Sequence, residues 1–120
     1  MRIVRKNDGW QVLGACGRLR LSLEAIAFRN GFRVSGISAT LGCSERYLYS
    51  IFVRDIGLPP KEWLAQVRML QARQRLRGGD DPGRVAADLG FSTPGSFRRE
   101  FIRCYGLSPL RYAVKMKEDG

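Results

Sequence analysis

Apolar residues recur at helical spacing along most of this chain. They fall three or four positions apart, as in Leu48, Ile51 and Phe52, or in Phe97 and Phe101. That period places them on one face of an α-helix, whereas a half-buried β-strand would alternate apolar and polar residues. The pattern predicts an all-α fold with about seven helices.

Capping residues, prolines and glycines mark where each predicted helix begins and ends. Ser, Thr and Asp cap helix starts, proline is tolerated in the first turn, and glycine ends a helix in the left-handed conformation. These signals predict helices at about residues 22–30, 35–41, 44–56, 60–77, 81–89, 93–105 and 108–117. The end of the chain, KMKEDG at residues 115–120, is expected to fray.

The fourth predicted helix is the longest. Its 18 or so residues would span about 27 Å at 1.5 Å per residue. One buried stripe is expected to follow it, formed by Trp63, Leu64, Val67 and Leu70 and extended by Ala72 and Leu76.

Residues 1–18 leave two predictions open. RIVRK and WQVLG flank NDG at residues 7–9 and could form a short hairpin around that turn. The same residues could instead form a mobile basic arm. Ile3, Val4, Trp10 and Val12 favour local order, because a pure linker would be less apolar.

One phrase occurs twice. GLPPKEW at residues 57–63 returns as GLSPLRY at 106–112, 49 positions later, whereas the earlier pair ATLGCS and ADLGFS is offset by 48. The second copy therefore contains one extra residue, at Ser92–Thr93. Each copy reads as a short helix, a turn and a second helix, which predicts two helix-turn-helix units.

The repeat also predicts how the chain is divided. We expect an N-terminal extension, a first helix-turn-helix unit, a connecting helix, a second unit and a tail, at residues 1–18, 19–58, 59–79, 80–117 and 118–120. Two recognition helices on one face of B-DNA must lie about 34 Å apart. A connecting helix of about 27 Å plus side-chain reach could set that distance.

The chain is strongly basic. It has 21 Lys and Arg against 11 Asp and Glu, a formal charge of +10. This favours a polyanionic partner, with nucleic acid first and an acidic membrane surface second. Most of the positive charge is arginine, which binds phosphate and guanine edges better than lysine does.

The sequence offers little for catalysis or metal binding. It has no histidine, and its cysteines, Cys16, Cys43 and Cys104, are far apart. A zinc site needs four N/S ligands, or three and a water. Without histidine or a nucleotide-binding motif, we expect no enzyme, no metal and no cofactor. With no apolar stretch of 18 residues and no signal peptide, we expect no membrane partner and a cytoplasmic location.

Three stretches resemble the DNA-binding domain of the AraC/XylS family of bacterial transcription regulators. They are ISATLGCSERYLYSIFVRDIGLPPKEWL, VRMLQARQRL and VAADLGFSTPGSFRREFIRCYGLSPLRY. The resemblance implies a monomeric activator in the bacterial cytoplasm, associated with the nucleoid. Such a domain inserts its recognition helices, residues 44–56 and 93–105, into successive major grooves of double-stranded promoter DNA and helps to recruit RNA polymerase.

The resemblance also implies which residues face the groove. By position they are Arg46, Tyr49 and Ser50 in the first unit, and Pro94, Gly95, Ser96 and Arg99 in the second. Arginine can bond guanine O6 and N7, tyrosine can meet a thymine methyl or a phosphate, and serine can bond base or backbone. Arg54, Arg98 and Arg103 are expected to contact phosphate.

Two further side chains are expected to have structural roles. Tyr47 is predicted to pack on the N-terminal helix, and Arg68 to form an ion pair. Pro94–Gly95 stands where the family often has polar side chains, so the second unit is expected to read fewer bases and more DNA shape. The chain has no room for an effector-sensing domain, so it is either a short member or a fragment.

Other functions remain open from the sequence. The chain could be a non-specific basic module that packages DNA or binds RNA, although most aromatic residues lie on predicted core stripes rather than on a stacking surface. A DNA-repair methyl acceptor would need a metal-bound cysteine cluster, and Cys16 has no such neighbours. A protein–protein module is the remaining alternative.

Overall fold

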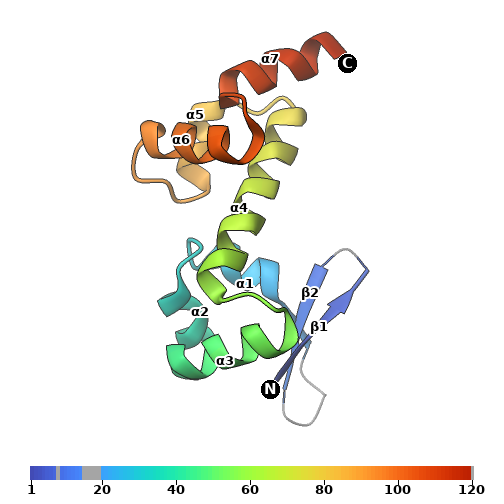
Figure 1. Ribbon diagram of the computed structural model, residues 1–120, viewed down its shortest axis with the longest axis vertical. Helices are drawn as coiled ribbons and strands as arrows, with labels where there is room; N and C mark the ends of the chain where they lie inside the picture. Colours follow the sequence, from blue (N-terminus) through green and yellow to red (C-terminus); the bar gives the residue numbers. More distant parts are fainter. Residues whose placement is uncertain (8, 15–19, 120) are drawn as a thin grey trace. The chain divides into compact units, whose positions relative to one another are not determined.

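The structure, a computed structural model, describes residues 1–7, 9–14 and 20–119. Across these residues three strands precede seven helices (Figure 1). The strands are β1 (Arg2–Lys6), β2 (Gly9–Leu13) and β3 (Arg20–Ser22). The helices are α1 (Leu23–Arg29), α2 (Val34–Leu41), α3 (Glu45–Asp55), α4 (Pro60–Arg77), α5 (Pro82–Asp88), α6 (Pro94–Tyr105) and α7 (Pro109–Asp119).

The predicted fold class is confirmed. The chain divides into two compact units, unit 1 (Met1–Ala65) and unit 2 (Gln66–Gly120), so α4 contributes residues to both. Predictions that concern Asp8, Cys16 and Gly120 fall outside the described residues.

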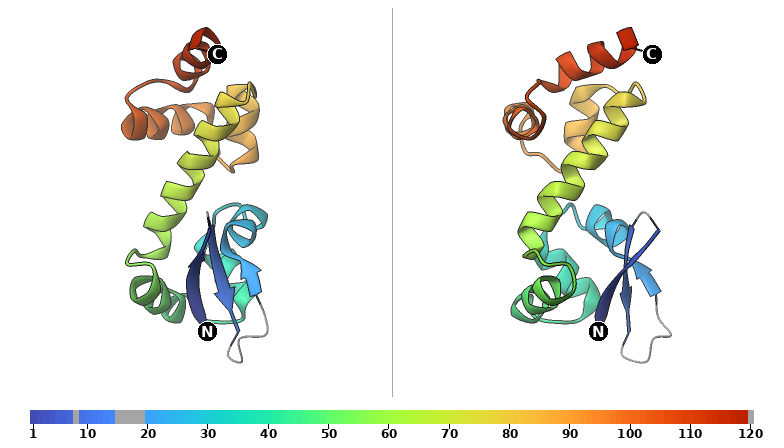
Figure 2. Two further views of the ribbon diagram at one scale, coloured as in Figure 1. Left: turned by 90° about the vertical axis from the view of Figure 1, so that its right-hand side faces the viewer. Right: turned by 45° about the vertical axis from the view of Figure 1, so that its right-hand side comes forward.

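The N-terminal residues form a small antiparallel sheet in the order β1-β2-β3 (Figure 2). Ile3 pairs with Val12 across the first two strands, and Gln11 pairs with Ser22 across the second and third. The hairpin prediction is therefore the right one of the two. The third strand was not predicted, because three residues are too few to show an alternating pattern.

In unit 1, α1 and α3 pack on this sheet, and α2 packs on α1 and α3. Leu48, Ile51 and Phe52 of α3 are buried. Phe52 meets Trp63 edge to face, with ring centroids 5.6 Å apart and planes at 75°. The tryptophan of GLPPKEW therefore anchors α4 to the second helix of the first unit.

Unit 2 repeats this arrangement 49 residues later. Phe97 and Phe101 of α6 are buried, and Phe101 meets Tyr112 at 5.6 Å and 68°. Gly106 ends α6 with φ of 78°, which only glycine adopts without strain. The phrase GLSPLRY thus has the same structural role as its first copy.

The extra residue of the second copy lies in its turn, as predicted. Cys43 N–H donates to the Ser38 carbonyl at 3.0 Å, and at an offset of 48 Phe91 N–H donates to the Ala86 carbonyl at 3.1 Å. The capping residues that follow, Ser44 and Thr93, are offset by 49. The insertion therefore falls between the turn and the start of α6.

Two sequence predictions are wrong in detail. Leu70 is exposed, whereas Met69 is buried with Ala72 and Leu76. The single stripe fails because the two ends of α4 pack in different cores. The expected fraying of residues 115–120 is also wrong for Lys115–Asp119, which continue α7.

Candidate nucleic-acid interface

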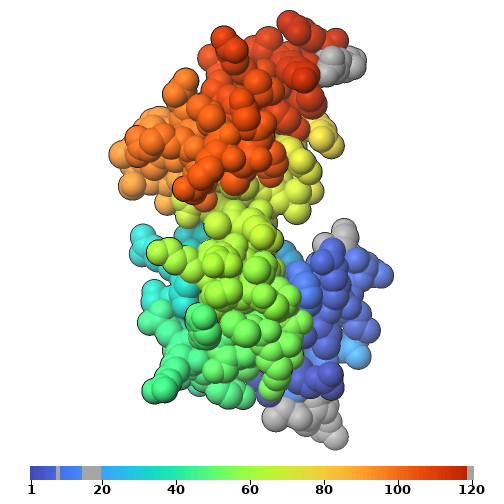
Figure 3. Space-filling model, in the orientation of Figure 1, coloured from blue at the N-terminus to red at the C-terminus, as the bar shows by residue number. Residues whose placement is uncertain are grey.

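Helix α3 presents a polar face on the side opposite its core residues. Ser44 caps it by accepting the Tyr47 N–H at 3.1 Å, which sets the start of the helix. Arg46, Tyr49 and Ser50 are exposed, Tyr49 by 53%. We call α3 and its counterpart α6 the recognition helices, and each lies at the surface of its own unit (Figure 3).

Helix α6 begins in the same way. Thr93 accepts the Ser96 N–H at 3.1 Å, and Pro94 occupies the first turn. Phe97 and Phe101 face the core, which leaves Arg99 and Arg103 exposed on the outer side. The structure thus gives the two recognition helices the same orientation within their units.

Ser50 and Ser96 were both predicted to contact DNA, and the hydroxyl group of each is hydrogen-bonded to a backbone carbonyl. Ser50 Oγ donates to the Arg46 carbonyl at 3.3 Å. Ser96 Oγ donates to the Thr93 carbonyl at 2.8 Å. Each hydroxyl still has lone pairs to accept a bond, so these serines can meet DNA only as acceptors or by giving up the internal bond.

Two aliphatic residues were not among the predicted DNA contacts: the sequence placed Val53 away from the core, and it placed Ile102 on the buried side of its helix. Val53 is 44% exposed on α3, and Ile102, its counterpart at an offset of 49, is partly exposed on α6. A branched apolar side chain in a major groove can contact a thymine methyl. The signal that could have identified these two residues is that an apolar side chain recurs at the same position of both predicted helices, 49 residues apart.

Arg54 is less available for phosphate than expected. Its guanidinium donates to both oxygens of Asp55, at 2.8 and 2.9 Å, and to the Met1 carbonyl at 2.9 Å. Asp55 Oδ2 also accepts the Ile3 N–H at 2.8 Å. The hydrogen bond from Arg54, and after it that from Ile3, lowers the pKa of Asp55 against the effect of burial.

Arg98 is exposed on α6. It lines a hollow on unit 2 with Pro82, Pro94 and Arg111, where the starts of α5, α6 and α7 come together. Arg103 is exposed in the last turn.

Two structural predictions about other side chains are wrong. Tyr47 is 47% exposed and is not packed away under α1. The Arg68 guanidinium lies 3.5 Å from the ring centroid of Phe91, a cation–π contact in place of the expected ion pair. Burial lowers the pKa of Arg68.

Within the described residues, no group of three or more His, Cys, Asp or Glu is placed to hold a metal. Burial raises the pKa of the Cys43 thiol, and Cys104 is exposed on α6. In the same part of the chain, no helix is long and apolar enough to cross a membrane.

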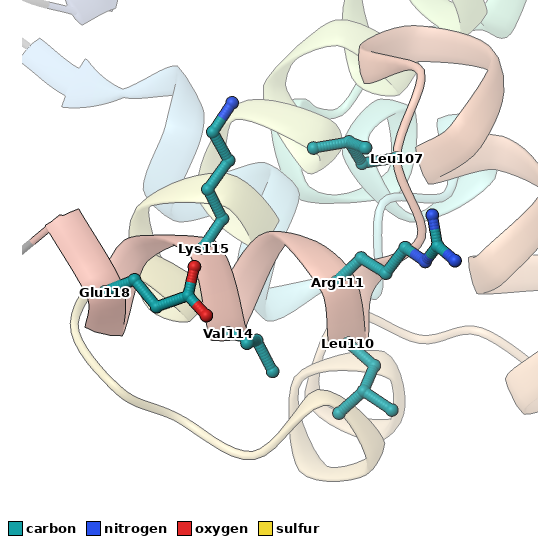
Figure 4. A pocket seen from close by; sticks show the side chains of 6 residues that line it. All are labelled: Leu107, Leu110, Arg111, Val114, Lys115 and Glu118. Carbon is teal, nitrogen blue, oxygen red and sulfur yellow. The ribbon is translucent and has the colours of Figure 1, made fainter.

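A separate apolar surface lies on α7. Leu110 and Val114, four residues apart, project from the same face of this helix (Figure 4). They are 65% and 48% exposed, and Arg111 and Lys115 border them. This surface belongs to neither recognition helix.

Known proteins share this arrangement. The family described as "Helix-turn-helix domain" matches residues 37–114. "Probable transcriptional regulator LumQ" of Photobacterium leiognathi is 31% identical over 80 residues, which are 66% of this chain and 32% of that protein. The DNA-binding domain of AdpA, solved in complex with a target DNA, has a TM-score of 0.69 and 30% identity, and the match covers 79% of this chain and 89% of that one.

The fold and the comparisons define a DNA-binding domain of a transcriptional regulator. The chain belongs to the AraC-type helix-turn-helix family. It spans about a third of the length of the curated relatives that it matches.

Proposed function

We propose that this domain binds specific double-stranded promoter sequences by inserting its two recognition helices, residues 44–56 and 93–105, into successive major grooves. The observation that carries the proposal is that α3 and α6 have outer faces of similar composition. Each face combines exposed arginine with an aliphatic side chain, Val53 or Ile102, on a helix held by a buried aromatic core. The similarity to a domain bound to its target DNA supports it.

The side chains on these faces have separate roles in the proposal. Arg46 and Arg99 bond guanine O6 and N7, which fixes sequence, and Tyr49 meets a thymine methyl or a phosphate. Arg98 and Arg103 contact phosphates, which fixes register but not sequence. The other proposed contacts, through backbone or short polar groups, are Ser50, Pro94, Gly95 and Ser96, and Arg54 reaches phosphate only by sharing its bond with Asp55.

The length of α4 supports reading by one monomer. Its 18 residues rise about 27 Å, and side-chain reach at each end adds to that. Successive major grooves on one face of DNA are about 34 Å apart. The two sites within one chain therefore need no dimer symmetry.

RNA polymerase is the second partner we propose, on the family resemblance. The exposed Leu110 and Val114 of α7 are the surface we assign to it, because they form an apolar patch on a helix that is not itself a recognition helix. Val114→Ala, which spares the hollow that Leu110 shares with Arg98, should leave promoter affinity unchanged and lower recruitment of polymerase to a promoter carrying the selected site. Unchanged recruitment would show that this surface is the wrong one.

The test of DNA binding is selection from random duplex DNA, followed by salt titration on the enriched duplex. Affinity should fall steeply with salt, because phosphate contacts release counterions. Arg46→Ala and Arg99→Ala should each reduce the preference for the enriched duplex over random duplex by about 5- to 100-fold. Lys115→Ala is the charge-matched control and should keep the preference.

Two results would reject the proposal. If random duplexes bind as tightly as the enriched one, the chain is a non-specific basic nucleic-acid-binding module. If the preference survives both arginine substitutions, sequence is read by other residues.

A further inference from the structure

The recognition helices carry a large and a small residue in opposite order at two positions one turn apart. In α3, Arg46 occupies the first turn and Ser50 the second. At an offset of 49, α6 has Gly95 in the first turn and Arg99 in the second. Each helix therefore has one arginine in this pair of positions, but not at the same one.

The structure shows where the side chain of Arg99 lies on α6. A Cβ atom placed on Gly95 would lie 3.5 Å from Nη1 of Arg99 and 3.9 Å from Oγ1 of the cap, Thr93. Side chains on a helix point toward its N-terminus, so a residue covers the turn before its own Cα. The Arg99 guanidinium therefore lies over the first turn of α6, in contact with the position that a Cβ at residue 95 would occupy.

In α3 the first turn contains the arginine itself. Arg46 is the second residue of the helix, and its side chain is exposed. Ser50 is short, and its hydroxyl is bonded to the Arg46 carbonyl at 3.3 Å, so it stays against the helix. Each recognition helix thus has one arginine at its start: Arg46 by its position in the first turn of α3, and Arg99 by folding back from the second turn of α6.

We propose that Gly95 and Arg99 act as a pair that replaces Arg46 in the second unit. Glycine leaves the first turn open, and Arg99 folds back to fill it and reads a guanine from there. The absence of a side chain at residue 95 is then a determinant of specificity rather than a lost base contact. This inference rests on the proposed function and names how the second unit reads its base.

The test exchanges the two positions. On the duplex enriched by the wild-type protein, Arg99→Ala should lose discrimination at one guanine by about tenfold or more. Adding Gly95→Arg to that variant should restore discrimination at the same guanine, because arginine then stands in the first turn itself. Ser96→Arg with Arg99→Ala is the matched control, which has the same charge one residue away and should not restore it.

Replacing that guanine by 7-deazaguanine, which lacks the N7 acceptor, should remove the preference of the wild-type protein and of the exchanged variant alike. The reciprocal exchange in α3, Arg46→Gly with Ser50→Arg, should keep the guanine read by the first unit. Circular dichroism melting checks that each variant is folded.

The outcomes separate this inference from the proposed function. A wild-type protein that enriches no sequence rejects the proposed function. A wild-type protein that enriches a sequence, while both folded exchange variants discriminate no better than Arg99→Ala or Arg46→Ala, overturns the pairing alone. Restoration by Ser96→Arg as well would also overturn it, because charge rather than position would then explain the result.

Discussion

Asp55 joins two parts of unit 1 that are far apart in the sequence. Its Oδ2 accepts the Ile3 N–H of β1 at 2.8 Å, a bond that spans 52 residues, and both of its oxygens accept bonds from Arg54. The Asp55 side chain is 14% exposed, whereas that of Arg54 is 56% exposed. Replacing Asp55 by alanine should therefore release the sheet from the end of the first recognition helix.

The expected loss of stability follows from the burial of Asp55 and the exposure of Arg54. A hydrogen bond to a charged acceptor contributes about 1.5–3 kcal/mol. The exposed pair with Arg54 adds less than about 1 kcal/mol, because water and salt screen it. We expect Asp55→Ala to lower the free energy of unfolding of unit 1 by about 2–3 kcal/mol, which corresponds to roughly 8–24 °C in melting temperature for a unit of this size.

Asp55→Asn should cost about half as much, because the amide oxygen can still accept the Ile3 N–H. The pKa of Asp55 is lowered in the folded protein, mainly by Arg54 and then by Ile3. A lowered pKa means that the carboxylate stabilises the fold above its unfolded pKa, about 3.9, and that this contribution is lost as pH falls through the folded value. The stability gap between wild type and Asp55→Asn should therefore be constant from about pH 5 to 7 and shrink below about pH 4.

Tryptophan fluorescence is a selective assay for this effect. Both tryptophans, Trp10 and Trp63, lie in unit 1, so their emission reports unfolding of that unit. Asp80→Ala in unit 2 is the matched control, because it also removes a carboxylate paired with an arginine, Arg75, at the surface. If Asp55→Ala melts within about 2 °C of wild type by fluorescence, the assigned role of the bond to Ile3 is refuted.

Three predictions concern unit 2 and can be checked by circular dichroism melting. Arg68→Met should change stability by less than about 1 kcal/mol, because methionine keeps an apolar contact with Phe91 and removes a buried Nε that has no partner among the described residues. A loss above about 2 kcal/mol would show that the guanidinium charge is needed. Gly106→Ala should cost about 1–2 kcal/mol, because φ is 78° there, and an unchanged melting temperature would mean that the turn relaxes without strain. Phe101→Ala should cost about 3–5 kcal/mol, because that ring is fully buried, and a loss below about 1 kcal/mol would contradict its place in the core.

The helix boundaries were predictable because their causes are local. Ser44 and Thr93 bond an N–H only three residues away, and Gly106 ends its helix through its own backbone conformation. The repeat of two helix-turn-helix units followed from the same signals, and the extra residue at Ser92–Thr93 was found by counting them. The buried side of each recognition helix followed from the spacing of its apolar residues, whereas the residues expected to face DNA came from the family resemblance.

Contacts between distant residues were not predictable in this way. Leu70 and Met69 are adjacent and both apolar, so their sequence does not say which one faces a core. Strand β3 exists because β2 offers an edge to pair with, and three residues carry no pattern of their own. Arg68 was expected to seek a carboxylate, but the ring of Phe91, 23 residues away, is the group that tertiary packing brings to it.

The sequence by itself determined the helices, their order, the duplicated unit and the positive charge, because caps, glycines, prolines and apolar spacing act over a few residues. The tertiary structure alone decided what surrounds Arg54. It brought the Met1 carbonyl to the Arg54 guanidinium and the Ile3 N–H to its partner Asp55, 53 and 52 positions away, whereas the contact of Arg99 with Gly95 lies within one helix. The physical reason is that a side chain's conformation and partners depend on neighbours that the chain brings together only when it folds.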